Sequence, residues 1–438
     1  MTTFKTSSLA LIGGVMLITS SPRSVQKVQT AFSEAITVCY TPRGCVFQTL
    51  FGEQASPHID GYLPSEAITA SLENGLSWII QAQQHNGGWG AGTHQRQDVL
   101  DPHAVQADPA TTAMVAMALL RTGNTLESGE YPEQLKKALF YLLDAVESTP
   151  DNRLKITTLS GTQIQTKLGD NIDAVLTAQF FSNIIPHLDN DQLKQRAKNS
   201  LNVCVDKIQE AQDADGSFKG SGWAGVLQSS LATTALESAE YEGAEIDEVV
   251  LEKARDYQKG NYDASSGKVK TDKGAGIVLY SVSGSVRSSA KEARKVKEAM
   301  QKAKINGELE EDADVSVENL MDIGYSREEA ARYNTAYQVY ESSKNTAQED
   351  RVMSGFGNNG GEEFLSYLQT GESLVVNDDK DWEQWYKDIS HRLLSIQNED
   401  GSWNGHHCIT SPVFCTATTL LTLSIHNDIE RLTTLGRG

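Results

Sequence analysis

Hydrophobic residues recur at helical spacing in three stretches of the chain, and each stretch runs into a polar turn. The stretches are residues 76–84, 201–212 and 386–397. Isoleucine, leucine or valine occupies one face of each stretch, which is typical of an amphipathic helix. Glycine stands in each following turn, where it tolerates the positive φ that often ends a helix. The pattern therefore predicts three helices that end in sharp reversals.

One phrase, Gln-x3-Gly-x-aromatic, joins the end of each helix to its turn. The three copies are Gln83, Gly87 and Trp89; Gln212, Gly216 and Phe218; and Gln397, Gly401 and Trp403. A second helical stretch rich in Ala, Ser and Thr follows each copy. Each of these stretches carries a Thr-Thr pair, at 111–112, 233–234 and 418–419. We align the three copies on these pairs. A unit of outer helix, turn and inner helix cannot bury its apolar face alone. We therefore expect about five to seven stacked helix pairs.

We predict an all-α chain in which these pairs either form an open superhelix or curl into an α/α toroid. Small residues on the inner helices favour the ring, because helices crowd at its axis. We assign residues 65–430 to the toroid, 26–64 to an N-terminal extension and 1–25 to a signal peptide or hydrophobic segment. Residues 285–345 form a predicted charged helical insertion in the ring.

The charge balance excludes some classes of partner. With 38 basic against 58 acidic residues, the chain has a formal net charge of −20. Nucleic-acid binding needs a concentrated basic surface, so we expect no nucleic-acid partner, and the acidity also disfavours strong membrane contact. The segment 9–18 after Lys5 has the lengths of a secretory signal, which slightly favours export over a cytoplasmic location.

The cysteines leave the redox compartment open. Cys39 can pair with Cys45 and Cys408 with Cys415, which leaves Cys204 alone. Five reduced thiols in a cytoplasmic protein are the alternative. Spacing alone does not choose between them.

The first copy of the repeat carries a family resemblance. Gly75, Trp78 and Ile79 precede Gln83, Gly87 and Trp89 in the order and spacing of the QW motif of squalene-hopene and oxidosqualene cyclases, with Asn74 in place of its leading basic residue. The chain thus resembles the prenyltransferase and squalene cyclase repeat superfamily. The resemblance implies an α/α toroid in which glutamine and aromatic tie each outer helix to the neighbouring repeat.

The catalytic motifs of that superfamily are missing. Neither the Asp-x-Asp-Asp of the cyclases nor the Asp-Asp-x-x-Asp of terpene synthases occurs, and the nearest acidic run, 378–381, lacks the spacing. Cys415 falls where the prenyltransferases have a zinc-binding histidine, but no Asp-x-Cys completes the set. The resemblance therefore implies the fold and not the activity.

The candidate catalytic and metal-binding residues lie in two turns. Since all turns of a ring emerge on one rim, we expect side chains from these two turns to lie close together. The catalytic candidates are Asp101 and Asp108 in the first turn, and His406, Cys408 and Cys415 in and after the last. His406, Cys408 and Cys415 are also the candidate ligands of a zinc ion. The alternatives are solvated loops, a helix cap at Asp108 before Pro109, and packing at Cys415.

These observations lead to three functional hypotheses. The first is a toroid that binds an apolar or isoprenoid-like ligand in a central cavity, with enzyme or binder left open. The second is a non-catalytic toroid that binds a protein partner. A weaker third is a glycan-acting toroid with paired carboxylates and an aromatic groove, to which Trp223, Trp382 and Trp385 are the candidates to contribute.

Overall fold

The computed structural model describes residues 62–437, apart from positions 151, 219, 221, 264, 265, 267 and 358. The chain divides into two compact units, Met1–Ala55 and Ser56–Gly438, and all described residues belong to the second. The predicted signal peptide, most of the predicted extension, Cys39 and Cys45 lie outside the described residues.

Almost all of the regular secondary structure of the described residues is helical, which confirms the all-α prediction. They form sixteen α-helices, and the two-residue strands β1 (Tyr262–Asp263) and β2 (Lys268–Val269) pair antiparallel. No helix among these residues combines the length and the apolar character needed to cross a bilayer.

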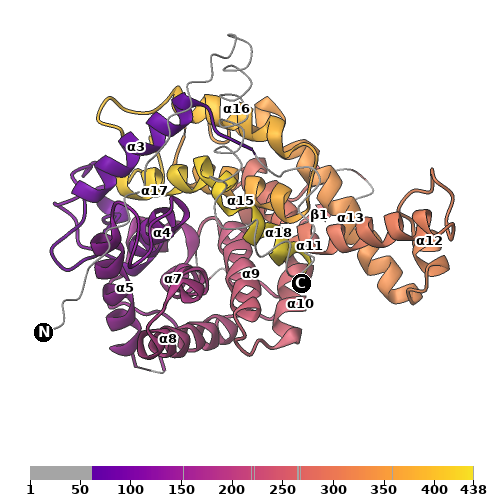
Figure 1. Cartoon of the computed structure of the whole chain (residues 1–438), viewed down its shortest axis with the longest axis horizontal. Coiled ribbons are helices and arrows are strands. Elements are labelled where there is room, and N and C mark those ends of the chain that lie inside the picture. Colours follow the sequence, from indigo (N-terminus) through magenta and orange to yellow (C-terminus); the bar gives the residue numbers. More distant parts are fainter. Residues whose placement is uncertain are drawn as a thin grey trace, which may run out of the picture. The chain divides into compact units, whose positions relative to one another are not determined.

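Within the described part of the chain, six largely buried helices contact one another in succession. These inner helices are α4 (Pro109–Arg121), α7 (Ile172–Ile184), α9 (Gly225–Tyr241), α11 (Val278–Ile305), α15 (Gly361–Val376) and α17 (Pro412–Leu423). Each packs on the next and α17 packs on α4, so the succession closes on itself (Figure 1). Every residue of α7, α15 and α17 is buried.

A second set of helices covers the inner ones and is buried on one face. These outer helices are α3 (Glu66–Gln81), α5 (Pro132–Glu147), α8 (Asp191–Glu210), α10 (Glu248–Lys259), α13 (Arg327–Ala347) and α16 (Trp382–Leu394). They pack against α17, α4, α7, α9, α11 and α15 respectively. In α5 the buried Leu135, Leu139 and Leu142 recur at helical spacing. Such an apolar face requires an inner helix to cover it.

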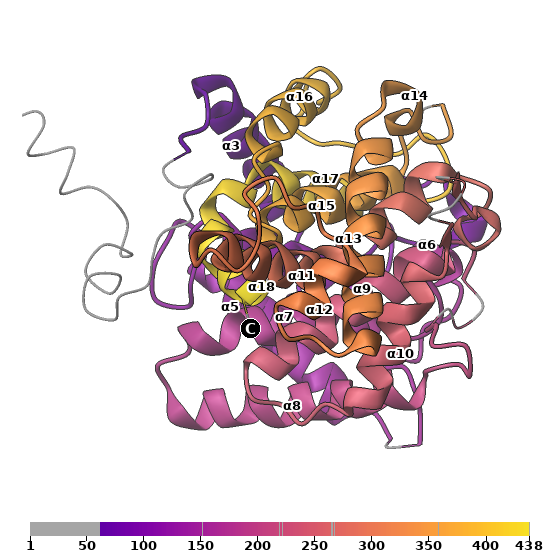
Figure 2. The same cartoon turned by 90° about the vertical axis from the view of Figure 1, so that its right-hand side faces the viewer.

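Shorter elements connect these helices. They are α6 (Gln163–Leu168), α12 (Val317–Asp322), α14 (Asp350–Met353), α18 (Ile429–Arg437) and the 3-10 helices η1 (His94–Arg96), η2 (Ile185–His187), η3 (Asp272–Gly274) and η4 (Ile425–Asp428). Figure 2 shows the same helices from the side, with α6 and α14 both at the right. Residues near these two short helices contribute to the site described below.

The three repeated glutamines make the same pair of hydrogen bonds. Each Nε2 donates to the carbonyl of its own turn glycine, at 2.9 Å for Gln83, 3.4 Å for Gln212 and 2.8 Å for Gln397. The same atoms also donate to a neighbouring outer helix, at Gln134 O (3.0 Å), Val250 O (2.7 Å) and Ser71 O (3.0 Å). Each glutamine therefore ties the end of one outer helix to the start of another.

The turn glycines are required by their backbone and by close packing. Gly87, Gly216 and Gly401 have φ of 86°, 85° and 92°. A Cβ atom on Gly401 would lie 2.6 Å from the carbonyl oxygen of Asn74 in α3. Both a positive φ and a backbone neighbour at this distance exclude larger residues without a local shift.

The inner helix is anchored to the turn through a hydroxyl group. The backbone N–H of Trp89 donates to Thr112 Oγ1 and that of Trp403 to Thr416 Oγ1, both at 2.9 Å. The N–H of Phe218 donates to Ser229 Oγ at 3.0 Å. Alignment of the copies on their Thr-Thr pairs is therefore wrong. Inner helices buried on all sides carry many threonines and serines, so such a pair does not mark one position.

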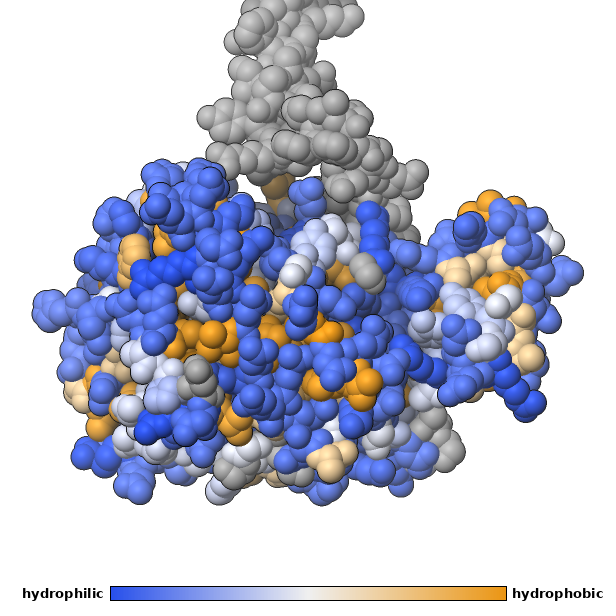
Figure 3. Space-filling view, turned by 90° about the horizontal axis from the view of Figure 1, so that it is seen from below, coloured by the Kyte–Doolittle hydropathy of each residue, from blue (hydrophilic) through white to orange (hydrophobic). Residues whose placement is uncertain are grey.

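The helices α11, α12 and α13 also enclose a small hydrophobic cluster of their own. It contains Val296, Met300, Leu320, Ala330 and Tyr333. We call this region the lobe. It projects at the right of Figure 1 around α12, and Figure 3 shows apolar side chains on its surface.

The predicted insertion begins inside an inner helix. Ser285 and Arg287 lie in the buried part of α11, and the lobe forms only from the second half of that helix. The predicted insertion therefore covers part of the packed core as well as the lobe. At the far end of the lobe, Ser326 and Glu329 form a reciprocal capping box at the start of α13.

Candidate functional site

The two aspartates of the first turn have different environments. Asp108 is the N-cap of α4 and is fully buried, and it accepts hydrogen bonds from Thr111 N (2.8 Å), Thr111 Oγ1 (2.9 Å) and Ala91 N (2.9 Å). Asp101 is exposed and accepts from the backbone of His103 at 2.9 Å. The predicted cap at Asp108 is confirmed, and the two carboxylates do not share a set of partners.

The candidates of the last turn also separate. His406 is exposed, and its backbone N–H donates to Asn359 O at 2.8 Å. Cys408 is half-buried, Cys415 is buried, and both thiols are free. Across the described residues, no three His, Cys, Asp or Glu side chains gather as a metal ion would require. The zinc hypothesis therefore gains no ligand set from these residues.

A pair of glutamates at the start of α15 was not among the predicted site residues. Glu363 is held on several sides: its Oε1 accepts from Tyr280 hydroxyl (2.7 Å) and Phe356 N (3.1 Å), and its Oε2 accepts from Gly360 N (2.9 Å). His407 Nε2 lies 3.6 Å from the same carboxylate. These contacts give Glu363 a positioning role at the helix start.

Glu362 is much less well satisfied. Its side chain is 2% exposed, and the hydrogen bond to its carboxylate comes from the backbone of Ile409 at 3.3 Å. Burial first, and then the charge of Glu363, raise the pKa of Glu362 to about 8, although Lys167 acts in the opposite direction. At neutral pH this carboxyl group is therefore mostly protonated.

Lys167 of α6 is buried beside an exposed tryptophan. The side chain is 2% exposed and its ammonium lies 3.6 Å from the centre of the Trp223 ring. Trp223 itself is 60% exposed, and its ring centre lies 6.4 Å from that of His94. Burial, followed by the charge of Lys167, lowers the pKa of His94.

Both Glu362 and Lys167 affect the pKa of the Cys408 thiol. Burial and then the charge of Glu362 raise the pKa of its thiol to about 11, while a hydrogen bond with Lys167 opposes this rise. Its backbone has φ of 58°, a left-handed conformation that is costly for a residue with a Cβ. Burial and then Glu362 also raise the pKa of Cys415, whose Sγ lies 3.6 Å from Ile409 O.

Gln163 lies one helical turn before Lys167 on α6. Its Oε1 accepts from the backbone of Thr410 (2.7 Å) and Ser411 (3.2 Å), which docks the last turn onto α6. Its Nε2 is buried and has no partner among the described residues. We call Gln163, Lys167, Trp223, Glu362 and Cys408 the Glu362 cluster. Of these five residues, Cys408 was a predicted catalytic residue, and Trp223 was named for a glycan groove.

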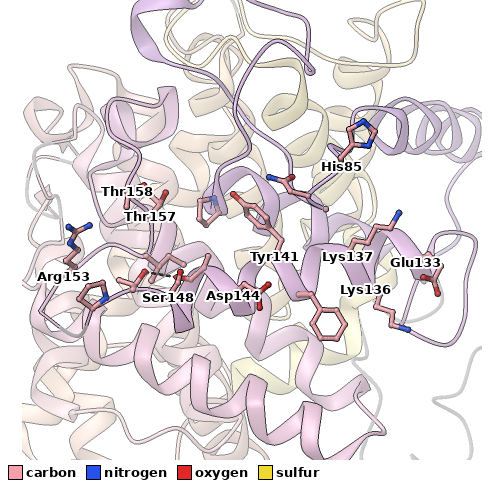
Figure 4. A pocket seen from close by; sticks show the side chains of 18 residues that line it. His85, Glu133, Lys136, Lys137, Tyr141, Asp144, Ser148, Arg153, Thr157 and Thr158 are labelled. Carbon is pink, nitrogen blue, oxygen red and sulfur yellow. Dashed lines mark hydrogen bonds between the residues drawn. The ribbon is translucent and has the colours of Figure 1, made fainter.

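Cavities also lie away from the Glu362 cluster. One small cavity between inner helices, lined in part by Met114, Arg121, Gln179 and Leu368, measures about 10 Å³. This volume holds one water at most, so an isoprenoid chain does not fit there. A groove of about 650 Å³ runs along α5 (Figure 4), but its charged side chains are exposed and carry both signs.

The other two candidate tryptophans are structural. Trp382 is 1% exposed and stacks on Tyr386 with ring centres 5.1 Å apart, and Trp385 is 3% exposed. Of the three tryptophans named for a glycan groove, Trp223 is the exposed one.

No protein-family model matches the chain, and no curated protein matches it either. Function is therefore inferred from the chemistry of the site.

Proposed function

We propose that the helix pairs form an α/α toroid of the kind found in the prenyltransferase and squalene cyclase repeat superfamily. The closed succession of inner helices and the three matching glutamine turns support this. In such a ring the inner helices run parallel, and their starts meet on one rim. Hydrogen bonds from Tyr280 at the start of α11 to Glu363, and from Ile409 before α17 to Glu362, agree with that arrangement.

We propose further that the Glu362 cluster performs acid–base catalysis on a carbohydrate, with Glu362 as the proton donor. The observation that carries this proposal is a buried carboxyl group with a pKa of about 8 beside Lys167 and Cys408. A general acid works best when its pKa lies near the working pH. In hydrolysis, Glu362 gives its proton to the glycosidic oxygen as the bond to the anomeric carbon breaks. Water then adds hydroxide to that carbon, and the proton left from the water restores the acid.

The surroundings of Glu362 favour a polar ring over a hydrocarbon. Trp223 presents an exposed aromatic face on which a sugar ring can stack. Lys167 and the unpartnered Nε2 of Gln163 are hydrogen-bond donors for hydroxyl or carboxylate oxygens. A carbohydrate uses both kinds of contact.

An isoprenoid-like ligand is the second candidate. A protonated buried acid such as Glu362 is also what alkene protonation requires, and Phe356, 65% exposed, lies beside His407 with ring centres 5.0 Å apart. The ligand would then bind at this mouth. A non-catalytic role would instead use the lobe, where Ile305 is 78% and Met321 44% exposed.

The test is a screen of neutral and acidic oligosaccharides for release of reducing ends, with the wild-type protein and Glu362→Gln. We expect the variant to lose at least about a hundredfold in rate, because a general acid contributes about 10²- to 10⁴-fold. Glu248→Gln, an exposed glutamate in the first turn of α10, is the matched control and should keep full activity.

Two outcomes would overturn the proposal. One is an unchanged rate in Glu362→Gln. The other is cleavage of no glycan together with a lipid retained on the purified protein in native mass spectrometry, which would favour the isoprenoid-like ligand.

A further inference from the structure

Lys167 is a buried cation without a carboxylate partner. Its side chain is 2% exposed and forms no ion pair within the described residues. Its neighbours are the face of Trp223 and the thiol of Cys408. Burying an ammonium group is costly unless an anion or several acceptors replace the lost water.

Two other buried lysines among the described residues have such a partner. Lys259, 7% exposed, lies 2.9 Å from Glu292, and Lys344, 4% exposed, lies 3.0 Å from Asp379. In both cases a carboxylate neutralises the buried lysine. Lys167 differs from these two lysines, and it lies where Trp223 reaches solvent.

The acids near Lys167 do not fill this role at neutral pH. Glu362 is mostly protonated there, since burial and Glu363 raise its pKa to about 8. Glu363 is engaged by Tyr280 and by two backbone N–H groups. The remaining titratable groups that face the cluster are His94, His407, Cys408 and Cys415, and none of them supplies an anion at neutral pH.

A second buried donor also has no acceptor. Gln163 is fully buried, its Oε1 is used by the last turn, and its Nε2 has no partner among the described residues. Gln163 and Lys167 are four residues apart on α6, a spacing that places both side chains on one face of a helix. An ammonium and an amide group on one face match the two oxygens of a carboxylate.

We propose that the Glu362 cluster binds the carboxylate of an acidic sugar, with Lys167 Nζ and Gln163 Nε2 as donors and Trp223 beside the ammonium group. This inference rests on the proposed carbohydrate function and names the substrate class as uronate-containing glycans. The ligand carboxylate supplies the counter-ion that the fold omits. The same ligand places its glycosidic oxygen beside Glu362.

Binding and protonation of Glu362 are then coupled. An anion on Lys167 removes the positive charge that favours ionised Glu362, so the bound complex holds the proton more tightly. Binding at a pH above about 8 therefore takes up protons, whereas binding at pH 6, where Glu362 is already protonated, takes up almost none.

The test is calorimetry with trisaccharides of galacturonate, glucuronate and mannuronate and with their methyl esters, which keep the ring and remove the charge. We expect wild-type protein to bind at least one acid about 10- to 100-fold more tightly than its ester. Lys167→Met should abolish that preference, whereas Lys167→Arg should retain part of it. Titrations of wild type at pH 9 in buffers of different ionisation enthalpy should show proton uptake, and Glu362→Gln should show none.

Equal affinity of wild-type protein for every acid and its ester would overturn the inference, and this outcome needs no variant to fold. Absence of binding to all three acids would overturn it as well. A different result would reject the proposed function and keep this inference. In that result, uronates bind through Lys167, but Glu362→Gln cleaves them as fast as wild type does. Conversely, cleavage of neutral glycans that depends on Glu362 but not on Lys167 would keep the function and reject the uronate.

Discussion

Charged side chains are buried near both ends of the inner helices, but they form ion pairs with one another at one of the two ends. At the C-terminal end of α4, Arg121 lies 2.5 Å from Glu372 of α15 and 3.0 Å from Asp428. At the opposite end, Lys167 has no ion-pair partner within the described residues, and Glu362 is held by one backbone donor. The first arrangement stabilises the fold. The second leaves these groups without a counter-ion, and departures of this kind are typical of functional sites, which is why we propose that a ligand binds there.

The largest loss of stability is expected when the ion pairs of Arg121 are removed. Arg121→Met leaves the buried Glu372 without its cation and removes one of the two arginines beside Asp428, and we expect a loss of about 3 to 5 kcal/mol in the free energy of unfolding. Chemical denaturation measures it. The exposed Arg153→Met is the control and should change stability by no more than about 0.5 kcal/mol. A cost below about 1 kcal/mol for Arg121→Met would remove the contrast between the two ends.

The next largest loss of stability is expected for a substitution in one of the glutamine turns. Gly401→Ala combines a φ of 92° with a Cβ atom 2.6 Å from Asn74 O, so we expect a loss of about 2 to 3 kcal/mol. Gly307→Ala has a φ of 73° but open space around it, and should cost about 1 kcal/mol. Thermal unfolding of the two variants side by side separates backbone strain from the close packing. Equal costs would show that the packing contributes nothing.

The two ends should respond to pH in opposite directions. Burial raises the pKa of Glu362 to about 8, so the folded state keeps a proton that the unfolded state loses above about pH 4.5. Its contribution to stability therefore falls as the pH rises from about 4.5 to 8. For Asp428, Arg431 and Arg121 outweigh burial and hold the pKa below its ordinary value, so its contribution is lost as the pH falls.

Glu362→Gln should therefore gain about 1 kcal/mol or more in stability relative to wild type between pH 5 and pH 8. Asp428→Asn should be less stable than wild type at pH 5, and this difference in stability should shrink as the pH is lowered toward 2. Denaturant titrations at several pH values measure both trends. The same direction of change in both variants would refute the comparison.

The smallest effect on stability is expected for Trp223→Ala. The side chain is 60% exposed, so its removal should change the free energy of unfolding by about 0.5 kcal/mol or less. Ligand affinity should nevertheless fall about tenfold, because the stacking face is lost. Trp382→Ala, which empties a buried site, should instead lose about 3 to 5 kcal/mol. Unchanged affinity in Trp223→Ala would exclude this residue from the site.

Much of the helical framework could be predicted from the sequence. The glutamine turns have a local signal, since Gln83, Gly87 and Trp89 lie within seven residues and make contacts that repeat in the other copies. The outer helices have an amphipathic pattern that the sequence displays. The inner helices lack it because they are buried on all sides, which is why the Thr-Thr alignment and the start of the insertion at 285 did not match the structure.

Most of the candidate site could not be predicted in the same way. Gln163 and Lys167, Trp223, Glu362 and Cys408 come from four separate segments, and no local pattern marks a lysine that will be buried without a partner. The Gly-Gly-Glu-Glu string at 360–363 is the available signal, because two acids at a helix start after glycines indicate a buried N-terminus. Cys408 was found because turns of a ring were expected to meet on one rim.

The most direct test of the central claim is the protonation state of Glu362. Carbon-13 NMR of glutamate-labelled protein, with Glu362→Gln to assign the resonance, reports the titration of this one carboxyl group. We predict a carboxyl group that stays protonated at pH 6 and titrates near pH 8. A carboxyl group that is fully ionised by pH 6 would contradict it.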